Sequence, residues 1–389
     1  MKRLAIITTH PIQYYAPIFE LLAQRQRLNL KVFYTAGKPK GDVYDQGFQR
    51  NIQWDIPLTQ GYIFEWMQNT ATQPGSHHFK GIINPELFAR ISDYHPDAIL
   101  VFGWAYDSHL KALRHFKGKV PVLFRGDSTL LDEKAGLKSI LRSLLLKWVY
   151  RHVDKALYTG TQNKAYYNKF GLDNRQLCFA PHAVDNERFS QTRNAEVNAL
   201  RTRLNINADE ILILFAGKLE VKKNPSLLLD AFMQLQRSNC YLLFTGNGML
   251  QQELQHKAAN HPRVRFMDFQ NQSYMPVIYQ ACDLFCLSSQ GPGETWGLAV
   301  NEAMACSKAI LVSDKVGCAV DLVKENINGA IFKSNNLPEL LACLHKLTAS
   351  KELLVTYGLN SYELIREWNF KHIAEAIENT VPEKTIQTE

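Results

Sequence analysis

The chain has 389 residues, of which 46% are hydrophobic and 21% are charged. This ordinary globular composition excludes a largely disordered chain, and the length favours two domains over one. The formal net charge of +7 is compatible with anionic ligands, a nucleic acid or an anionic membrane surface, and by itself selects none of them.

The cysteines and the apolar runs indicate the cellular setting. Seven cysteines are scattered along the chain, which is typical of buried thiols in a reducing compartment. Cys282 and Cys286 have no second pair or histidine cluster nearby, so we expect no zinc site. The first apolar run is too short for a signal peptide, and no run reaches the ~20 residues of a membrane span. We expect a cytoplasmic protein that is soluble or peripheral on the inner face of a membrane.

Short apolar runs alternate with longer helix-like segments along the whole chain. Runs rich in Val, Ile, Leu and Phe that end in Gly, Ser or Thr are typical of strands buried on both faces of a parallel sheet. In chain order, the expected strands cover residues 4–9, 30–35, 98–103, 120–126, 155–160, 211–217, 241–246, 264–267, 283–289 and 309–314. The sequence therefore predicts an α/β fold with two Rossmann-like, doubly wound domains.

The strand pattern stops and polar residues dominate between residues 180 and 210. We place the domain boundary near Ser190, with an N-terminal domain over 1–190 and a C-terminal domain over 191–365. Residues 366–389 contain a last helix whose local pattern leaves its packing partner open, the N-terminal domain being one option. Ligands of open α/β sheets bind beyond the carboxyl ends of the strands. We therefore expect the site in the strand-to-helix loops, at a cleft between the two domains.

Three loops of the N-terminal half carry candidate ligand contacts. His10 and Gln13 follow the first expected strand in THPIQYYAP, where a histidine that caps the next helix is the alternative. Trp104 follows a later strand in GWAYDSHL, where an aromatic face can stack on a ligand ring or a helix can simply begin. Asp127 in LFRGDST can accept a hydrogen bond from a ligand hydroxyl or cap the following helix.

The segment GLKSILRSLLLKWVYRHV combines apolar side chains at helical spacing with interleaved basic residues. A helix that covers a Rossmann sheet has this pattern, and we expect that packing. A basic amphipathic helix lying on an anionic membrane leaflet has the same pattern and is the alternative.

Two loops in the C-terminal half carry lysines and glycines directly after expected strands. In FAGKLEVKKNPSLLLDAF, Gly217 is followed by Lys218 and Lys223, which can neutralise a phosphate as point charges; a solvated basic loop is the alternative. Gly246 in FTGNGML allows the backbone to approach a ligand closely, or simply makes a tight turn.

A third loop, in GETWGLAVNEAMA, carries two glutamates around a helix start. Glu294 precedes the helix, and the amides at Gly297 and Leu298 offer free N–H groups that suit a phosphate. Glu302 points away from the apolar face of the helix, so a solvated surface glutamate is the simplest interpretation of it alone. The two carboxylates lie up to about 12 Å apart along the axis. This spacing implies an elongated ligand, with hydroxyl groups at both ends and phosphate between them.

The order of these motifs resembles a known family. The segments GKLEVKKN, FTGNGML, VRFMDFQ, YQACDLFCLSS, ETWGLAVNEAMA and VGCAVDLVKENINGAIF follow one another as in the donor-binding half of family 4 glycosyltransferases, which have the GT-B fold. The resemblance is strongest over residues 210–332. It implies a retaining hexosyltransferase that moves a sugar from a UDP- or GDP-linked donor to a glycan or lipid-linked acceptor, in the synthesis of a cell-envelope polysaccharide such as lipopolysaccharide or capsule.

The resemblance also implies roles for single residues. Lys218 and Lys223 would neutralise the donor diphosphate, and the amides at Gly297 and Leu298 would hold its oxygens. Glu294 would accept hydrogen bonds from the transferred sugar, and Glu302 from the ribose.

The first half of the chain departs from the family, whose glycine-rich first loop and mid-domain histidine are missing, so the acceptor side is less defined. Lysines and a helix start supply the positive charge that the leaving diphosphate needs, and we expect no metal and no other cofactor. We also expect no nucleic-acid partner. The alternatives are a nonhydrolysing nucleotide-sugar epimerase and a catalytically inactive homologue that binds a nucleotide-sugar.

Overall fold

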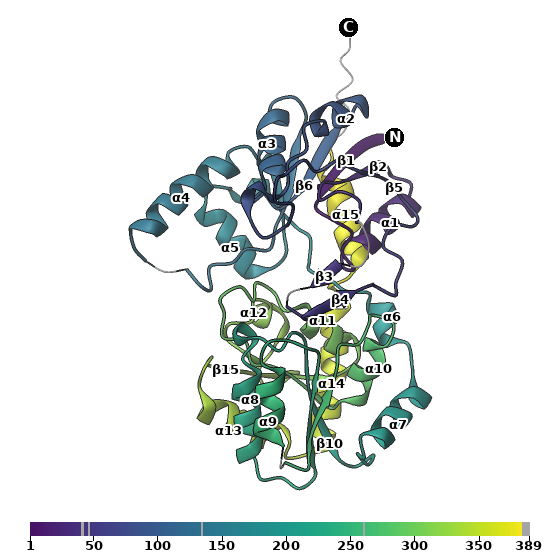
Figure 1. Ribbon diagram of the computed structural model, residues 1–389, viewed down its shortest axis with the longest axis vertical. Helices are drawn as coiled ribbons and strands as arrows, with labels where there is room; N and C mark the ends of the chain where they lie inside the picture. The colour runs from purple at the N-terminus through teal and green to yellow at the C-terminus, as the bar shows by residue number, and fades with distance from the viewer. Residues whose placement is uncertain (40–42, 46, 134, 260, 383–389) are drawn as a thin grey trace. The chain divides into compact units, whose positions relative to one another are not determined.

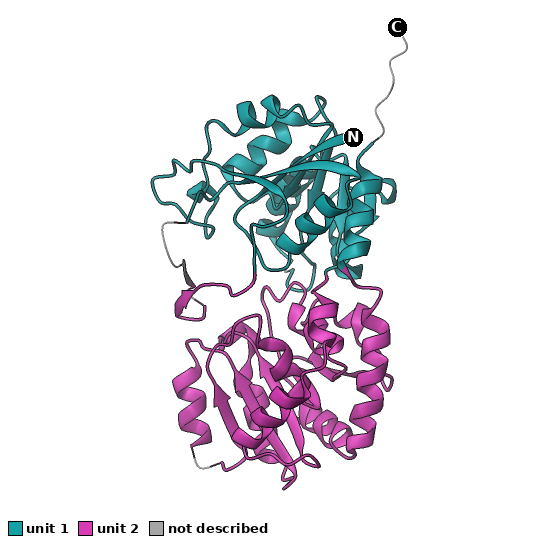
Figure 2. Ribbon diagram, turned by 90° about the vertical axis from the view of Figure 1, so that its right-hand side faces the viewer, with its two compact units in different colours: residues 1–41, 57–182, 370–389 teal, residues 42–56, 183–369 magenta. Residues whose placement is uncertain are grey.

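The structure is a computed structural model that describes residues 1–39, 43–45, 47–133, 135–259 and 261–382. It divides into two compact units (Figures 1 and 2). Unit 1 comprises residues 1–41, 57–182 and 370–389, and unit 2 comprises residues 42–56 and 183–369. In mid-chain the chain thus passes from unit 1 to unit 2 after residue 182, which is before the boundary that we expected near Ser190. A short segment of the first half, residues 42–56, belongs to unit 2.

Unit 1 is built on a parallel sheet with seven strands among the described residues. In spatial order these are β5 (Ile63–Trp66), β2 (Leu28–Tyr34), β1 (Lys2–Thr8), β6 (Ala98–Phe102), β7 (Val122–Arg125), β8 (Lys155–Tyr158) and β9 (Leu177–Phe179). The central strands are buried along their length, because helices cover both faces of the sheet. The helices of this unit are α1 (Ala16–Gln24), α2 (Leu87–Asp93), α3 (Asp107–Phe116), α4 (Leu137–Tyr150), α5 (Thr161–Lys169) and α15 (Phe370–Thr380), with short 3-10 turns at Phe79–Gly81 and Asn174–Gln176.

Unit 2 has a parallel sheet with six strands in the part of the chain that the structure covers. Their spatial order is β12 (Val264–Met267), β11 (Cys240–Thr245), β10 (Ile211–Ala216), β13 (Leu284–Leu287), β14 (Ala309–Ser313) and β15 (Gly329–Phe332). The helices are α6 (Asn186–Ser190), α7 (Asn194–Arg203), α8 (Pro225–Gln234), α9 (Gln251–Ala258), α10 (Met275–Ala281), α11 (Leu298–Ala305), α12 (Ala319–Leu322), α13 (Leu337–Leu347) and α14 (Lys351–Ile365), with a 3-10 turn at Val221–Lys223. Counted along the chain, the strands lie in the order 3-2-1-4-5-6 of a doubly wound nucleotide-binding sheet.

A two-stranded hairpin from the first half of the chain packs within unit 2. It pairs β3 (Val43–Asp45) with β4 (Arg50–Ile52) in antiparallel register. The rings of Phe48 and Trp54 lie 4.9 and 6.2 Å from the ring of Phe269, measured between centroids. These aromatic contacts attach the hairpin beside the carboxyl end of β12.

The last helix, α15, belongs to unit 1, where it packs on α1, β8 and β9. Ile373, Ala374 and Ile377 are buried in this packing. The Arg25 guanidinium donates to both carboxylate oxygens of Glu378, at 2.7 and 2.9 Å. The final described helix is therefore part of the N-terminal core.

The expected α/β fold with two Rossmann-like sheets is confirmed, and all ten expected strands are present. The expected packing of α4 is wrong over most of its length. Leu146, Val149 and Tyr150 are buried, whereas the aliphatic side chains of the earlier turns are exposed. In the described part of the chain, no helix combines the length and the apolar character that crossing a bilayer requires.

Candidate functional site

The strand order of unit 2 reverses between β10 and β13, which pair with each other in the sheet. Such a reversal leaves a crevice at the carboxyl ends of the two strands, where ligands of open α/β sheets bind. The loop after β10 runs over residues 217–224, and the loop after β13 over residues 288–297. Most of the candidate donor residues lie in these two loops.

Lys223 and Glu294 come from different loops and form a close ion pair. The Lys223 ammonium lies 2.6 Å from Oε2 of Glu294, and the two side chains are only 15% and 9% exposed. The Ser289 hydroxyl donates to the same oxygen at 3.0 Å. The structure thus brings together two residues that lie 71 positions apart in the sequence.

Two hydrogen bonds to backbone carbonyls link the two loops. The Ser288 hydroxyl donates to the Asn224 carbonyl at 2.8 Å, and the Gln290 amide donates to the Lys222 carbonyl at 2.8 Å. These bonds fix the loop that carries Lys223 against the loop that carries Glu294. Their ion pair is therefore part of a preformed arrangement.

The charge state of Glu294 follows from these neighbours. Burial raises the pKa of its carboxyl, but the attraction and hydrogen bond of Lys223 and the hydrogen bond of Ser289 outweigh burial, so the pKa is lowered. Glu294 is therefore ionised at neutral pH and can accept hydrogen bonds from hydroxyl groups.

Gly246 lies where the loop after β11 comes close to the loop after β10. Its φ is +131°, and a Cβ at this position would lie 2.1 Å from the carbonyl oxygen of Gly217. Any other residue would push the two loops apart, because the obstruction is backbone. Gly246 thus allows its backbone to lie close to the backbone of Gly217.

Helix α11 begins at the switch point. Its N-cap is Gly297, with φ +96°, and its first residue is Leu298. A Cβ at Gly297 would lie 2.9 Å from Cγ1 of Val316, so the helix start is packed closely against the loop after β14. The first amides of a helix have no partner inside the helix and carry partial positive charge. They can therefore bind phosphate oxygens.

Glu302 lies inside α11 and is 4% exposed. The Tyr279 hydroxyl, on α10, donates to its Oε2 at 2.8 Å. The interpretation of Glu302 as a solvated surface residue is therefore wrong. Every residue of α11 from Val300 to Ala305 is buried, so this helix has no solvent face over that stretch.

Lys218 is paired with the hairpin. Its ammonium lies 2.9 Å from Oδ1 of Asp45 and 5.0 Å from the centroid of the Phe48 ring. Burial raises the pKa of the Asp45 carboxyl, but Lys218 and the amides of Phe48 and Gly47 outweigh burial, so the pKa is lowered. A lysine expected to face a diphosphate thus already has an anionic partner, which the sequence analysis missed.

The two N-terminal candidates after β1 lie in the segment between that strand and α1. His10 is exposed, with its Nδ1 3.0 Å from the Thr9 hydroxyl, and Gln13 is partly exposed. The N-cap of α1 is Tyr15, without a side-chain cap. The alternative role of His10 as a helix cap is therefore wrong, and both side chains lie at the carboxyl edge of the unit 1 sheet.

The other two N-terminal candidates lie after β6 and β7. Trp104 is partly buried and packs against the core of unit 1. The Asp127 carboxylate lies 3.9 Å from Nε2 of His182 and is 48% exposed. The next helix, α4, is capped by Gly136, so Asp127 does not serve as its cap.

Arg125 and His182 are additional buried polar residues near Asp127. Arg125 ends β7, is 2% exposed, and donates to the carbonyls of Ala180 and Pro181 at 2.8 and 2.9 Å. Burial, helped by the Arg125 charge and opposed by Asp127, lowers the pKa of His182 to about 3. His182 is therefore neutral at physiological pH. Arg125 lies in LFRGDST and His182 lies in the polar region near the expected domain boundary, but the sequence could not show that these segments meet.

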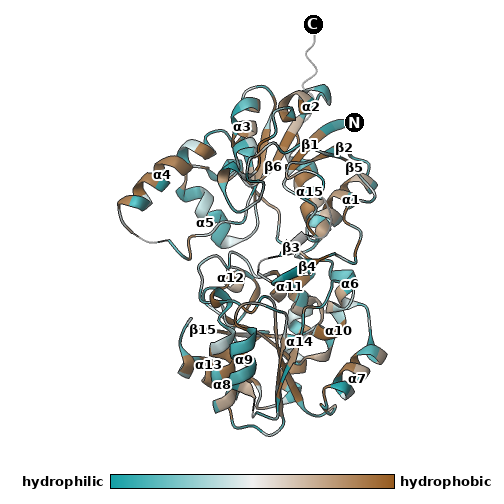
Figure 3. Ribbon diagram, in the orientation of Figure 1, coloured by the Kyte–Doolittle hydropathy of each residue, from teal (hydrophilic) through white to brown (hydrophobic). Residues whose placement is uncertain are grey.

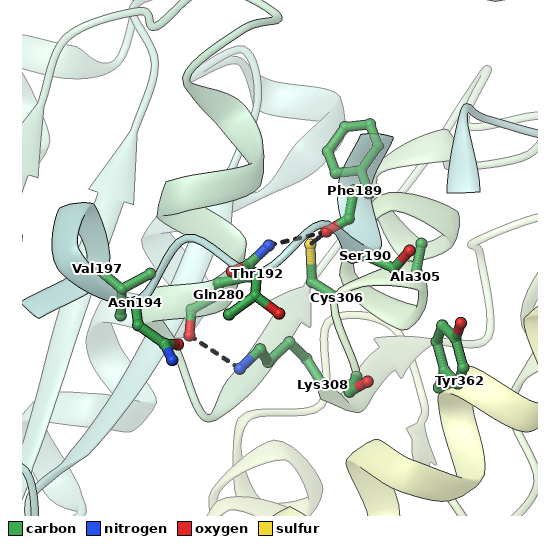
Figure 4. Close-up of a pocket in the computed structure, with 11 residues that line it drawn as sticks. Phe189, Ser190, Thr192, Asn194, Val197, Gln280, Ala305, Cys306, Lys308 and Tyr362 are labelled. Atoms are coloured by element: carbon green, nitrogen blue, oxygen red, sulfur yellow. Dashed lines mark hydrogen bonds between the residues drawn. The ribbon is translucent and has the colours of Figure 1, made fainter. Parts of the chain in front are cut away.

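A separate hollow of about 340 Å³ lies at the carboxyl end of α11 (Figure 4). Its polar groups are partly satisfied by the protein, since the Lys308 ammonium donates to the Gln280 carbonyl at 2.9 Å and Cys306 Sγ lies 3.2 Å from the Phe189 carbonyl. None of the candidate residues lines it. The hollow is at the end of α11 opposite to Gly297 and is not part of the candidate site.

The described residues contain no group of three or more His, Cys, Asp or Glu side chains arranged for a metal ion. Cys282 and Cys286 are buried free thiols. Burial raises the pKa of Cys282 to about 12 and also raises that of Cys286. Both thiols are therefore protonated at neutral pH.

Two doubly wound parallel sheets in one chain are the architecture of GT-B glycosyltransferases, and solved structures with that architecture match nearly the whole chain. The UDP complex of Anabaena Alr3699/HepE covers 98% of this chain and 99% of its own, with a TM-score of 0.74 at 17% identity. Sucrose-phosphate synthase from Thermosynechococcus elongatus covers 97% and 98%, with a TM-score of 0.74 at 19% identity. At these identities the likeness establishes the fold.

Residues 196–363 match the family model for glycosyl transferases group 1. The matched segment lies within unit 2 and includes every candidate donor residue. Among curated relatives, D-inositol 3-phosphate glycosyltransferase of Geodermatophilus obscurus is 25% identical over 210 residues, covering 50% of this chain and 45% of that protein. An uncharacterized glycosyltransferase of Methanocaldococcus jannaschii is 29% identical over 133 residues, 33% of each chain. The chain thus matches less than half the length of these relatives.

Proposed function

We propose that the protein is a retaining glycosyltransferase of family 4 that transfers a hexose from a UDP- or GDP-linked donor to a glycan or lipid-linked acceptor, without a metal ion. The observation that carries this proposal is the buried Lys223–Glu294 pair, 2.6 Å apart, at the switch point of unit 2. A cation suits the donor diphosphate and an ionised carboxylate suits sugar hydroxyls, and here both groups are fixed side by side before a ligand arrives.

The remaining residues follow from the position of that pair. The diphosphate would lie between Lys223, Lys218 and the amides at Gly297 and Leu298. Glu294 would accept hydrogen bonds from the transferred sugar. Glu302, on α11, would accept hydrogen bonds from the ribose. These bonds would replace or add to the bond that Glu302 accepts from the Tyr279 hydroxyl.

The proposed chemistry needs no separate base. The bond between the anomeric carbon and the diphosphate oxygen breaks while the acceptor oxygen bonds to the same face of that carbon. The acceptor proton passes to the departing phosphate oxygen, so that configuration is retained. Negative charge grows on the diphosphate during this step, and Lys218, Lys223 and the start of α11 stabilise it.

The proposed acceptor contacts come from unit 1. His10, Gln13, Trp104 and Asp127 lie in loops at the carboxyl ends of β1, β6 and β7, and we assign them to acceptor or sugar contacts. Two relatives carry the names D-inositol 3-phosphate glycosyltransferase and mannosylfructose-phosphate synthase, and each name contains a phosphorylated polyhydroxyl compound. We also propose a role in cell-envelope polysaccharide synthesis, since WaaG, a glycosyltransferase of similar fold, is involved in lipopolysaccharide biosynthesis.

The donor is identified by measuring the unfolding midpoint against UDP- and GDP-sugars in the presence of a chelator. The correct donor raises the midpoint, because it binds only the folded protein. The same donor is then incubated without acceptor. Slow release of free sugar indicates a transferase, conversion to an epimeric nucleotide-sugar indicates the epimerase alternative, and binding without either indicates an inactive homologue.

Lys223→Ala tests the site, with Lys222→Ala as the matched control in the same loop. Lys223 touches the Glu294 carboxylate, whereas Lys222 pairs with Glu220 and is 39% exposed. Loss of a charge-assisted contact to phosphate should weaken donor binding by about 10- to 100-fold in Lys223→Ala. Equal donor affinity in the two variants, measured by calorimetry, would refute the assignment of this site.

A further inference from the structure

Helix α4 presents a broad aliphatic face to solvent. In its first turns Leu137 is 81% exposed, Leu141 69% and Leu144 61%, and Ile140 and Leu145 beside them are 58% and 46% exposed. At about 100° per residue these side chains fall within an arc of about 140°, and the ribbon of α4 carries hydrophobic stretches in Figure 3. The buried residues Leu146, Val149 and Tyr150 lie outside that arc. We call the five exposed residues the aliphatic stripe.

The charged residues of the helix that carries the stripe have one sign. The segment from Ala135 to His152 contains four basic residues and no acidic residue. Lys138 and Lys147 are exposed, and at about 100° per residue they flank the stripe on its two sides. Arg142 differs, since its guanidinium lies 3.5 Å from the Glu133 carboxylate.

A basic hollow of about 510 Å³ adjoins the carboxyl end of the same helix. Its lining includes Phe88, Trp148, Lys111, Arg114 and Arg151, together with two histidines. The guanidinium carbons of Arg114 and Arg151 lie 5.4 and 5.9 Å from the centroid of the Trp148 ring. Lys111 pairs with Asp107, whereas no carboxylate among the described residues forms an ion pair with either arginine. Two cations are thus held on an indole ring, beside the end of the stripe.

We infer that α4 and this hollow form a docking surface for an anionic lipid membrane. The aliphatic stripe would enter the boundary between headgroups and acyl chains, with Lys138 and Lys147 beside the lipid phosphates. Arg114 and Arg151 would bind a lipid phosphate in the hollow, with Trp148 at the level of the headgroups.

A bilayer explains both features at once. A free phosphate would occupy the hollow and leave the stripe in water. A second copy of this helix would cover the stripe but would bring more basic residues and no acidic ones. The surface lies entirely within unit 1 and does not depend on the donor site of unit 2. The failure of one proposal therefore leaves the other standing.

The stripe is tested by sedimentation of the protein with phosphatidylcholine vesicles that contain about one third phosphatidylglycerol. Leu141→Glu/Leu144→Glu should weaken binding at least about 10-fold, because two apolar side chains are replaced by anions. The matched control is Val355→Glu/Leu359→Glu on α14, whose side chains are 55% and 58% exposed, and it should bind as the wild type does. Unfolding midpoints of both variants verify that they are folded.

The hollow is tested with Arg114→Gln/Arg151→Gln on the same vesicles. Loss of two cations near an anionic surface should weaken binding roughly 30-fold, and added inorganic phosphate should compete weakly. Light scattering without vesicles measures the oligomeric state. The inference is overturned if the wild type fails to bind the anionic vesicles, or if both variants bind as it does. It is also overturned if the wild type is a dimer that Leu141→Glu/Leu144→Glu dissociates, since a second copy would then cover the stripe.

Discussion

At the scale of single residues, the pairing of Lys218 with Asp45 sets a competition. The Asp45 carboxylate lies 2.9 Å from the ammonium that we assign to the donor diphosphate. A bound diphosphate must share or displace this partner. We therefore expect Asp45 to lower the affinity for a diphosphate ligand while it keeps Lys218 in place.

Asp45→Asn should therefore raise the affinity for UDP or GDP several-fold, as measured by calorimetry, since the lysine loses its internal anion. Asp230→Asn is the control, because Asp230 pairs with Lys257 on the surface of the same unit. Weaker nucleotide binding in Asp45→Asn than in the control would show that Asp45 helps to position Lys218 and does not compete with the ligand.

Buried histidines give unit 1 a pH dependence. Burial lowers the pKa of His182 to about 3 and that of His109 to about 4, from an ordinary value of 6.5. Between 6.5 and these values the unfolded chain binds protons that the folded chain does not, so stability falls as the pH falls.

The slope should reach up to about 1.4 kcal/mol per pH unit for each histidine. His182→Gln should reduce the slope between pH 6.5 and about 3, while the contribution of His109 persists. Denaturant unfolding of both proteins at a series of pH values measures this difference. An unchanged slope would mean that His182 is protonated in the folded state.

At the scale of elements, the start of α11 depends on one glycine. Gly297 and Gly293 both have positive φ, +96° and +91°. An added Cβ would lie 2.9 Å from Val316 Cγ1 at Gly297, but would meet nothing within 4 Å at Gly293. An alanine would therefore cause backbone strain at both positions, but a steric conflict only at Gly297.

Gly297→Ala should lower the stability of unit 2 by about 1 to 3 kcal/mol more than Gly293→Ala, because overpacking adds to a shared backbone cost. Donor affinity should fall with it, since the helix start moves. Denaturant unfolding and calorimetry check both effects. Equal stability of the two variants would indicate that Val316 can move aside without cost.

The central strands could be predicted because a strand that is buried on both faces of a sheet consists of consecutive apolar residues. The strands that were missed are short or lie at sheet edges. Both edge strands of unit 1, β5 and β9, and the edge strand β15 have only three or four residues. Shortness alone does not explain the omission, because the four-residue edge strand β12 was predicted. The hairpin strands β3 and β4 also have three residues each, so neither they nor the role of Asp45 could be predicted.

The candidate site was predictable where motifs sit at strand ends, since topology brings those ends together. The surroundings of a side chain were not predictable where they depend on a residue from another element. Glu302 was expected to be solvated because it leaves the apolar face of α11, yet α10 supplies Tyr279 on that side. The pattern of α4 likewise fits a core helix and a helix with an exposed apolar face equally well. The functional roles of the site residues remain predictions.

At the scale of the whole molecule, the last described helix, α15, completes the core of unit 1. The Arg25 guanidinium on the C-terminal side of α1 holds both oxygens of Glu378, whose side chain is 5% exposed. Arg27 adds a longer contact of 3.4 Å. This charge cluster fixes α15 to residues more than 350 positions earlier in the chain.

Arg25→Ala should lower the stability of unit 1 by about 1 to 3 kcal/mol, because it leaves a buried carboxylate with only its weaker partner. Arg366→Ala is the control, since that arginine and Glu363 are 63% and 66% exposed, and such a pair contributes about 0 to 1 kcal/mol. Thermal unfolding distinguishes the two. Equal losses would show that Arg27 alone suffices to hold Glu378.

The route of the chain between the units has a consequence for biosynthesis. The chain passes from one unit to the other after residues 41, 56, 182 and 369. A ribosome therefore delivers the hairpin of the second unit before the rest of that unit, and delivers the closing helix of the first unit after the whole second unit. Unit 1 therefore lacks its last helix until unit 2 has been translated. Because each unit is built from separate stretches of the chain, neither unit can be expressed complete from one continuous piece of the gene.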